Sequence, residues 1–199
     1  AATAVTVLRR VRTVGSALAL GLGVLVIGVL GALTWQRGYA YADEETLWRD
    51  TLRTNPDAFI ANNNLGGILL LRGELEPATG LFETALRSKP DFAESLGNLG
   101  LVRHRQGRLD EAVSFFNEAL RCDPNFADGH NNLGIVLAQQ GKWSEALDHF
   151  YQAVRIRPSF AKAHQNLGLT LEGLGRTGEA AEEYRETLRL TPDAPIVEM

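Results

Sequence analysis

Apolar residues recur along most of the chain at helical spacing, in pairs of short stretches that flank a glycine. In the stretch 133–154 the apolar positions are Leu133, Ile135, Val136, Leu137, Ala146, Leu147, Phe150 and Val154. Apolar residues three or four positions apart form one face of a helix, so each stretch predicts an amphipathic helix. Gly141 lies between the two stretches and can adopt the positive φ that ends a helix. The pattern predicts a helical hairpin.

The same hairpin pattern returns every 34 residues. Five classes of residue keep this period: Asn-Leu-Gly steps at 64–66, 98–100, 132–134 and 166–168; prolines at 56, 90, 124, 158 and 192; glycines at 73, 107, 141 and 175; alanines at 78, 112, 146 and 180; and aromatic residues at 82, 116, 150 and 184. Numbering each repeat from Phe59, Ala93, Ala127 or Ala161 places Leu at position 7, Gly at 8 and 15, Ala at 20, an aromatic residue at 24 and Pro at 32. A fixed period of this size is typical of stacked repeats.

The repeat resembles the tetratricopeptide repeat (TPR), a helix–turn–helix unit of 34 residues. The resemblance covers roughly residues 43–192 and implies an all-α, right-handed TPR solenoid. We expect the small residues at positions 8 and 20 to let the two helices of a hairpin approach closely. The aromatic residue at 24 is expected to fill the space between neighbouring hairpins.

These positions define the predicted boundaries. Four repeats occupy 59–92, 93–126, 127–160 and 161–192, and the tail 193–199 has no pattern. Residues 43–58 match only the second half of a repeat, with Trp48 at the aromatic position and Pro56 at the proline position. We expect this half-repeat, a single helix, to cap the first full hairpin.

The N-terminal segment differs from the repeats. Between Arg12 and Arg37 lie 24 residues without a charge, and about 20 such residues span a bilayer core. We therefore predict a transmembrane helix at 14–35, followed by a short linker at 36–42. A cleaved signal peptide is the alternative, because AYA at 40–42 is similar to a cleavage site; signal peptides, however, have apolar regions of only about 7–15 residues.

The charges around the predicted span indicate its orientation. The flank 1–13 carries Arg9, Arg10 and Arg12, and such clusters lie on the cytoplasmic side. The repeats are then extracytoplasmic, either periplasmic or lumenal. The chain begins at Ala1, so we also expect it to be a fragment or a processed product.

Charge and cysteine content narrow the function classes. Residues 1–40 contain four of the 20 Lys and Arg residues and none of the 24 Asp and Glu residues, which leaves a net charge of −8 (16 against 24) on the remainder. No nucleic-acid partner is expected, since phosphate binding depends on clustered Lys and Arg. The single Cys122 permits no disulfide within the chain.

The sequence shows no catalytic constellation, so this chain is not expected to be an enzyme by itself. His130 and His164 share repeat position 4, so the period explains them, and stacking would supply only two ligands to a zinc ion. We expect no metal site and no cofactor. Glu182 and Glu183 are expected to lie on a solvated face.

The asparagine at position 6 of each repeat is the candidate binding residue. Leu at 7 and Gly at 8 face the hairpin interior, whereas position 6 lies on the opposite face of the first helix. An Asn amide has an acceptor and donors, so it can pair with the main chain of a bound peptide. These asparagines resemble the ladder along the groove of the O-GlcNAc transferase superhelix, which implies contact with a peptide backbone. The predicted peptide-binding residues are Asn64, Asn98, Asn132 and Asn166.

Two functions from different classes follow. The first is a membrane-anchored protein–protein interaction module that binds an extended protein segment in its concave, asparagine-lined groove. The second is the C-terminal, acceptor-binding part of a polytopic membrane glycosyltransferase. The junction of a final membrane helix with TPR hairpins is similar to that of the transmembrane-and-TPR O-mannosyltransferases, and Trp48, Pro56 and the position 6 asparagines carry this resemblance.

Overall fold

The computed structural model describes residues 43–192, and every regular element in this range is a helix. The chain divides into two units, residues 1–50 and 51–199. In the first unit only residues 43–50 are described, and they begin α2 (Glu44–Thr54). The Asp43 carboxylate accepts hydrogen bonds from the Thr46 hydroxyl at 3.2 Å and from the Glu45 backbone N–H at 3.4 Å. An aspartate in this position stabilises the first turn of a helix.

The predicted membrane span at 14–35 lies outside the described residues, as do the flank 1–13, the linker 36–42 and the tail 193–199. Within residues 43–192, no helix combines the length and apolar character needed to cross a bilayer. The proposed cap formed by 43–58 stays a prediction.

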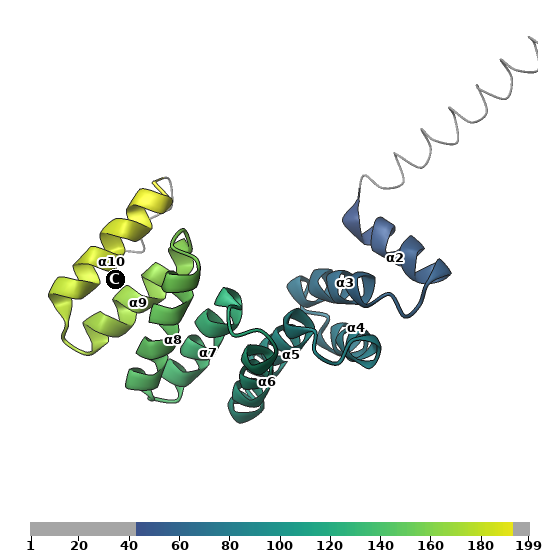
Figure 1. Cartoon of the computed structure of the whole chain (residues 1–199), viewed down its shortest axis with the longest axis horizontal. Coiled ribbons are helices and arrows are strands. Elements are labelled where there is room, and N and C mark those ends of the chain that lie inside the picture. Colours follow the sequence, from purple (N-terminus) through teal and green to yellow (C-terminus); the bar gives the residue numbers. More distant parts are fainter. Residues whose placement is uncertain (1–42, 193–199) are drawn as a thin grey trace, which may run out of the picture. The chain divides into compact units, whose positions relative to one another are not determined.

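The second unit consists of consecutive helix pairs (Figure 1). The pairs are α3 (Phe59–Leu71) with α4 (Leu75–Ser88), α5 (Ala93–Arg105) with α6 (Leu109–Cys122), α7 (Ala127–Gln139) with α8 (Trp143–Ile156), and α9 (Ala161–Gly173) with α10 (Thr177–Leu190). The two helices of each pair pack together, and each second helix packs on the first helix of the next pair. First helices of neighbouring pairs also contact each other, whereas second helices make no contact of comparable extent. The first helices therefore lie closer together than the second helices.

Glycine at position 15 forms each turn, as the sequence predicts. Gly73, Gly107, Gly141 and Gly175 have φ values between 74° and 82°. After α7, the Gly141 N–H donates to the Ala138 carbonyl and the Lys142 N–H donates to the Leu137 carbonyl, each at 2.9 Å. Such bonds satisfy the free carbonyls at a helix C-terminus and need a left-handed residue, which glycine supplies without a Cβ clash.

Glycine at position 8 allows the aromatic ring at position 24 to pack against the first helix. A Cβ on Gly134 would lie 2.7 Å from Cε1 of Phe150, and a Cβ on Gly100 would lie 2.8 Å from Cε1 of Phe116. Phe116 also belongs to the same core cluster as Leu133 in the following pair. The aromatic residue thus fills space between hairpins, as expected, and in addition closes its own hairpin.

Candidate functional site

The four predicted asparagines lie at the same position of successive first helices. Asn64 is on α3, Asn98 on α5, Asn132 on α7 and Asn166 on α9, and each is half-buried. Position 7 beside them is buried, as at Leu133 and Leu167. We call the surface formed by positions 2, 5, 6 and 9 of these helices the first-helix face.

Two of the asparagines bond to the preceding repeat. The amide nitrogen of Asn98 donates to Oδ1 of Asn63 at 3.0 Å, and that of Asn166 donates to Oδ1 of Asn131 at 2.9 Å. The Ser95 hydroxyl donates to the same oxygen of Asn63 at 2.9 Å. Asn98 and Asn166 therefore have a structural role besides the predicted binding role. They join neighbouring first helices.

The other two asparagines have a different environment. Oδ1 of Asn64 accepts from Nδ2 of Asn63, and Oδ1 of Asn132 accepts from Nδ2 of Asn131, both at 3.4 Å. Within residues 43–192, the amide nitrogens of Asn64 and Asn132 donate to no protein group. These two amides keep both N–H donors for solvent or a ligand.

Apolar and charged side chains flank the asparagines. Ile60 is 52% exposed and Leu169 is 39% exposed. At position 2, Asp128 forms an ion pair with Arg157, while Glu94 and Lys162 are exposed. The first-helix face thus combines apolar contacts, both signs of charge and a central row of amides. Such a surface suits a protein segment.

Near the C-terminal ends of the first helices, two further side chains join neighbouring repeats. A guanidinium nitrogen of Arg105 donates to the backbone carbonyl of Leu70, a residue near the end of α3. The ring Nε2 of His104 lies 2.8 Å from Oε1 of Gln139. The Arg105 cation is favourable at the end of α3 because the unpaired carbonyls of a helix C-terminus carry partial negative charge.

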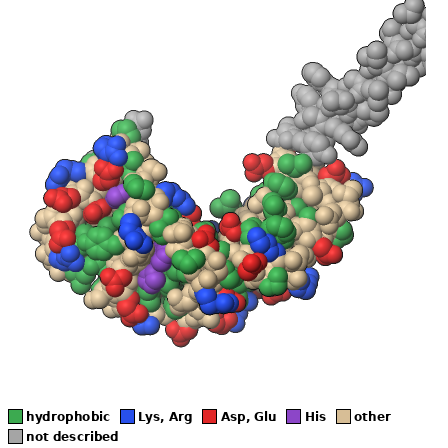
Figure 2. All heavy atoms as spheres, viewed as in Figure 1, with side chains coloured by type: hydrophobic (Ala, Val, Ile, Leu, Met, Phe, Trp, Pro, Cys, Tyr) green, Lys and Arg blue, Asp and Glu red, His purple; other side chains and the backbone are tan. Residues whose placement is uncertain are grey.

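The histidines at position 4 have partners within their own hairpins. The shared repeat position suggested that stacking would bring His130 near His164, but Nδ1 of His130 lies 2.9 Å from Nδ1 of His149, within one hairpin. Nδ1 of His164 lies 2.6 Å from Oε2 of Glu183, so the assignment of Glu183 to a solvated face was wrong. Positions 4 and 23 meet in both hairpins. Figure 2 shows histidine side chains at the surface of the part of the array that holds α7–α10.

In the first, third and fourth repeats, the polar residue at position 4 also bonds to the loop that precedes the first helix. Nε2 of His130 lies 3.3 Å from the Pro124 carbonyl, and Nε2 of His164 lies 3.0 Å from the Pro158 carbonyl. In the first repeat Asn62 donates to the Pro56 carbonyl at 2.8 Å. In the sequence, a polar residue six positions after each of these prolines could have indicated this bond.

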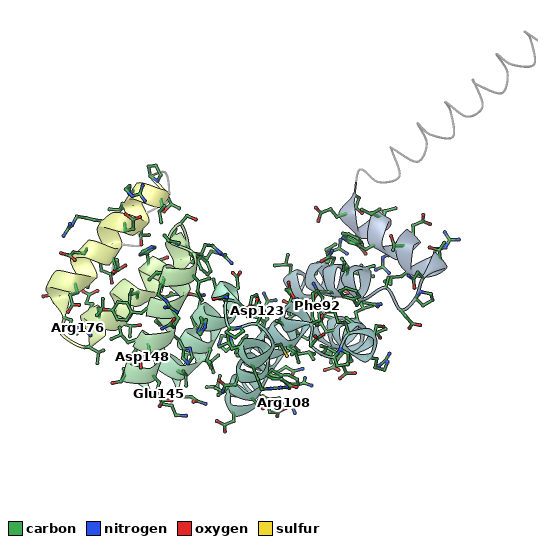
Figure 3. The ribbon with its side chains drawn as sticks, in the orientation of Figure 1. Phe92, Arg108, Asp123, Glu145, Asp148 and Arg176 are labelled. Carbon is green, nitrogen blue, oxygen red and sulfur yellow. The ribbon has the colours of Figure 1, made fainter. Side chains whose placement is uncertain are left out.

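Burial lowers the pKa of His130 and of His149. For His130 the positive charge of Arg155 lowers the pKa further, whereas the hydrogen bond to the Pro124 carbonyl opposes the shift. For His149 the charge of His130 acts in the same direction as burial, against Asp148 and Glu145. Both acidic residues lie on α8 with His149 (Figure 3). The neutral imidazoles are therefore favoured in the folded hairpin.

Among residues 43–192, no three His, Cys, Asp or Glu side chains are grouped so that they could hold a metal ion. Cys122 is a half-buried free thiol at the end of α6.

The comparisons with known proteins agree with this geometry. A family model described as Tetratricopeptide repeat matches residues 57–125, 91–159 and 125–193. A solved structure of MamA is similar, with 22% identity and a TM-score of 0.61 over 73% of this chain and 85% of that one. PilF of Pseudomonas aeruginosa has 27% identity and a TM-score of 0.66, over 70% of this chain and 64% of that one.

A third similar structure is that of YrrB, described as a TPR protein with an unusual peptide-binding site. It has 21% identity and a TM-score of 0.56, over 83% of each chain. No curated protein sequence matches the chain. These likenesses concern the fold of the repeats.

Proposed function

Because the chain belongs to the tetratricopeptide repeat family, we propose that residues 59–192 form a protein-interaction module that binds an extended segment of another protein along the first-helix face. One observation carries this proposal: one half-buried Asn amide per repeat, in line on four neighbouring first helices, each with hydrogen-bonding groups that no described residue uses. The peptide-binding site of the similar protein YrrB supports it.

The spacing of the amides fits a main chain. Packed helices lie about 8–10 Å apart, and an extended chain advances about 3.3 Å per residue. One amide per repeat then corresponds to one peptide unit in about every three residues. Ile60, Leu169 and the charges at position 2 would provide the contacts that select side chains.

The proposal is tested with the full 199-residue chain in detergent micelles and a random library of 15-residue peptides displayed on phage. The tightest selected peptide, labelled with fluorescein, serves as the probe in anisotropy titrations. We expect Asn64→Ala with Asn132→Ala to weaken its binding about tenfold or more, the loss of two hydrogen bonds. Asn117→Ala is the matched control, because Asn117 is exposed on α6, away from the first-helix face.

Equal binding by the asparagine pair variant and by the Asn117 control would overturn the proposal. A library that gives no binder would overturn it as well. Circular dichroism melts of both variants establish that the fold is retained.

We also propose that residues 14–35 anchor this module to a membrane, with the repeats on the extracytoplasmic side. The 24 uncharged residues between Arg12 and Arg37 carry this step. In a Cys122→Ser background, a membrane-impermeant maleimide should label Ser144→Cys and not Thr3→Cys in intact cells. Labelling of Thr3→Cys, or release of the chain by alkaline carbonate, would contradict it.

The glycosyltransferase alternative stays a prediction from the sequence resemblance at Trp48, Pro56 and the asparagines. The genomic sequence upstream of Ala1 tests it. Further membrane spans in the same reading frame would make acceptor binding the role of the repeats in a larger enzyme, and their absence would remove this alternative.

A further inference from the structure

The amides of the first-helix face do not all present the same groups, and this difference rests on the residue at position 5 of the preceding repeat. Position 5 is Asn63, Gly97, Asn131 and Gln165 in the successive repeats. Where position 5 is Asn, its Oδ1 accepts from the Nδ2 of the next position 6 asparagine, as in Asn63 with Asn98 and in Asn131 with Asn166. The oxygen of the position 6 amide and its second N–H are then left without a partner among residues 43–192.

Gly97 interrupts this arrangement for a packing reason. A Cβ at Gly97 would lie 2.7 Å from Cε1 of Phe126, so a larger residue there would force the Phe126 ring to move. Repeat 2 therefore offers no side chain to hold Asn132. Among residues 43–192, the amide of Asn132 is positioned by Asn131 alone, which donates to its oxygen at 3.4 Å and leaves both N–H groups without a partner there. Asn64 is held in the same way by Asn63.

We infer that the first-helix face alternates between amides that keep both N–H donors, at Asn64 and Asn132, and amides that keep an unshared carbonyl oxygen, at Asn98 and Asn166, and that it binds an extended main chain in the matching register. This inference rests on the proposed function and adds which group of the ligand each asparagine takes. Ligand carbonyls accept from Asn64 and Asn132, and ligand N–H groups donate to Asn98 and Asn166.

The alternation selects the conformation of the ligand. Each edge of an extended chain presents carbonyl and N–H groups in turn, and neither is used within the chain. In an α-helix these groups bond to each other, so a helical segment has none to offer along its length. The two donor positions, Asn64 and Asn132, are two repeats apart, as are the two acceptor positions, Asn98 and Asn166. Two repeats correspond to about 16–20 Å, a distance that an extended chain covers in about five or six residues.

Aspartate substitutions separate donors from acceptors, because a carboxylate accepts hydrogen bonds and cannot donate them. We expect Asn132→Asp to weaken binding of the selected 15-residue peptide about tenfold, since a ligand carbonyl would face an oxygen. Asn98→Asp keeps an acceptor and should leave the affinity within about threefold of the unmodified chain. Each variant adds one negative charge, so the pair is matched for charge.

Thermal stability should show the opposite order. Asn98→Asp removes the bond to Asn63 and places two oxygens together, so its melting temperature should fall by about 2–4 °C. Asn132→Asp loses no donated bond within residues 43–192 and should melt within about 1 °C of the unmodified chain. The pair Asn166→Asp and Asn64→Asp repeats the comparison independently.

An amide-to-ester scan of the same peptide provides the test from the ligand side, because an ester lacks the N–H donor. We expect two sensitive positions five or six residues apart. Equal losses for Asn98→Asp and Asn132→Asp, or a larger loss for Asn98→Asp, would overturn the alternation and leave the proposed function standing. No loss in either variant would show that the peptide binds elsewhere, and both proposals would then fail.

Discussion

The third and fourth hairpins place histidine at the same repeat position and give it different chemistry. His130 and His164 each lie near a proline carbonyl through Nε2, and each directs Nδ1 to position 23 of its own hairpin. The partner is His149 in the third hairpin and Glu183 in the fourth. Burial disfavours protonation of both imidazoles in the third hairpin, and for His149 the charge of His130 adds to this effect. The repeat thus determines which positions meet, and the residue at position 23 determines which group the histidine contacts.

The two hairpins also differ in how their aromatic residues are enclosed. Phe150 is 1% exposed and belongs to a cluster that includes Leu167 of the next hairpin. Tyr184 is half-buried, and its hydroxyl donates to Glu172 at 2.8 Å. Burial together with this bond raises the pKa of Tyr184 to about 12. Position 24 is therefore fully enclosed in the third hairpin and partly open to solvent in the fourth.

The largest effect should come from removing the two aromatic rings. Phe150→Ala leaves a closed cavity and should lower the free energy of unfolding by about 3–5 kcal/mol. Tyr184→Ala should lower it by about 1–3 kcal/mol, because a half-exposed ring loses less apolar burial. Urea denaturation followed by circular dichroism measures both. Equal losses would mean that the fourth hairpin is as enclosed as the third.

Adding a methyl group at position 8 should give a smaller difference. A Cβ on Gly134 or on Gly168 would lie 2.7 Å from the ring of Phe150 or Tyr184. The enclosed Phe150 ring has little room to move, so overpacking of about 1–3 kcal/mol outweighs the gain of about 1 kcal/mol from replacing glycine in a helix. The ring of Tyr184 lies partly in solvent and can shift. We expect Gly134→Ala to lower the urea midpoint and Gly168→Ala to leave it nearly unchanged.

The histidine pair of the third hairpin should make thermal stability depend on pH. The folded-state pKa of His130 and of His149 lies below the unfolded value of about 6.5. Their contribution to stability is therefore present above about pH 6.5 and is lost as the pH falls through the folded-state pKa values. His149→Glu gives the third hairpin the partner of the fourth, and the drop in melting temperature between pH 7.5 and pH 5 should become smaller.

The reverse change, Glu183→His, is the control for the histidine pair. It should make the drop on acidification larger, because the fourth hairpin would then contain two neighbouring imidazoles. Both variants are compared with the unmodified chain in the same buffers. An unchanged pH dependence in both would contradict the role assigned to position 23.

The smallest effect is expected at the ion pair of the third hairpin. Asp128 and Arg157 have side chains that are 45% and 44% exposed, and the corresponding positions of the fourth hairpin are Lys162 and Thr191. Exposed ion pairs contribute about 0–1 kcal/mol. Asp128→Asn should therefore shift the urea midpoint only slightly, and 0.5 M salt should remove the shift. A salt-independent loss would indicate a structural role beyond the ion pair.

The sequence predicted the elements whose cause lies within one repeat. Helical spacing, the turn glycines and the small residues at position 8 depend on local geometry, and the period of 34 made each of them visible four times. The contact of the position 24 ring with position 8 of its own hairpin was seen only in the structure. The all-helical TPR array was predicted in this way. The capping role of 43–58 and the span at 14–35 stay predictions.

The site was predicted only as a row of positions. The bonds of Asn98 to Asn63 and of Asn166 to Asn131 join residues 35 apart, and they depend on position 5, which changes from repeat to repeat. The 34-residue period identifies residues that are the same in every repeat. It therefore does not reveal a contact that is present in some repeats and absent in others. The sequence held a signal in the Asn, Gly, Asn, Gln series at position 5. The reason for glycine at position 97 is the Phe126 ring, and the contact between the two is visible only in the structure.

The separation of 35 residues has a consequence for how the chain folds. Within residues 43–192, the side-chain bonds between first helices join adjacent hairpins, so none of them depends on a distant part of the sequence. Folding of such arrays can begin in any hairpin and extend to its neighbours, with low contact order and short loops to close. An Asn98–Asn63 or Asn166–Asn131 pair exists only when both of its hairpins are formed. The amide row is therefore assembled pair by pair as the array grows, and local opening of one hairpin would release the amide of the next.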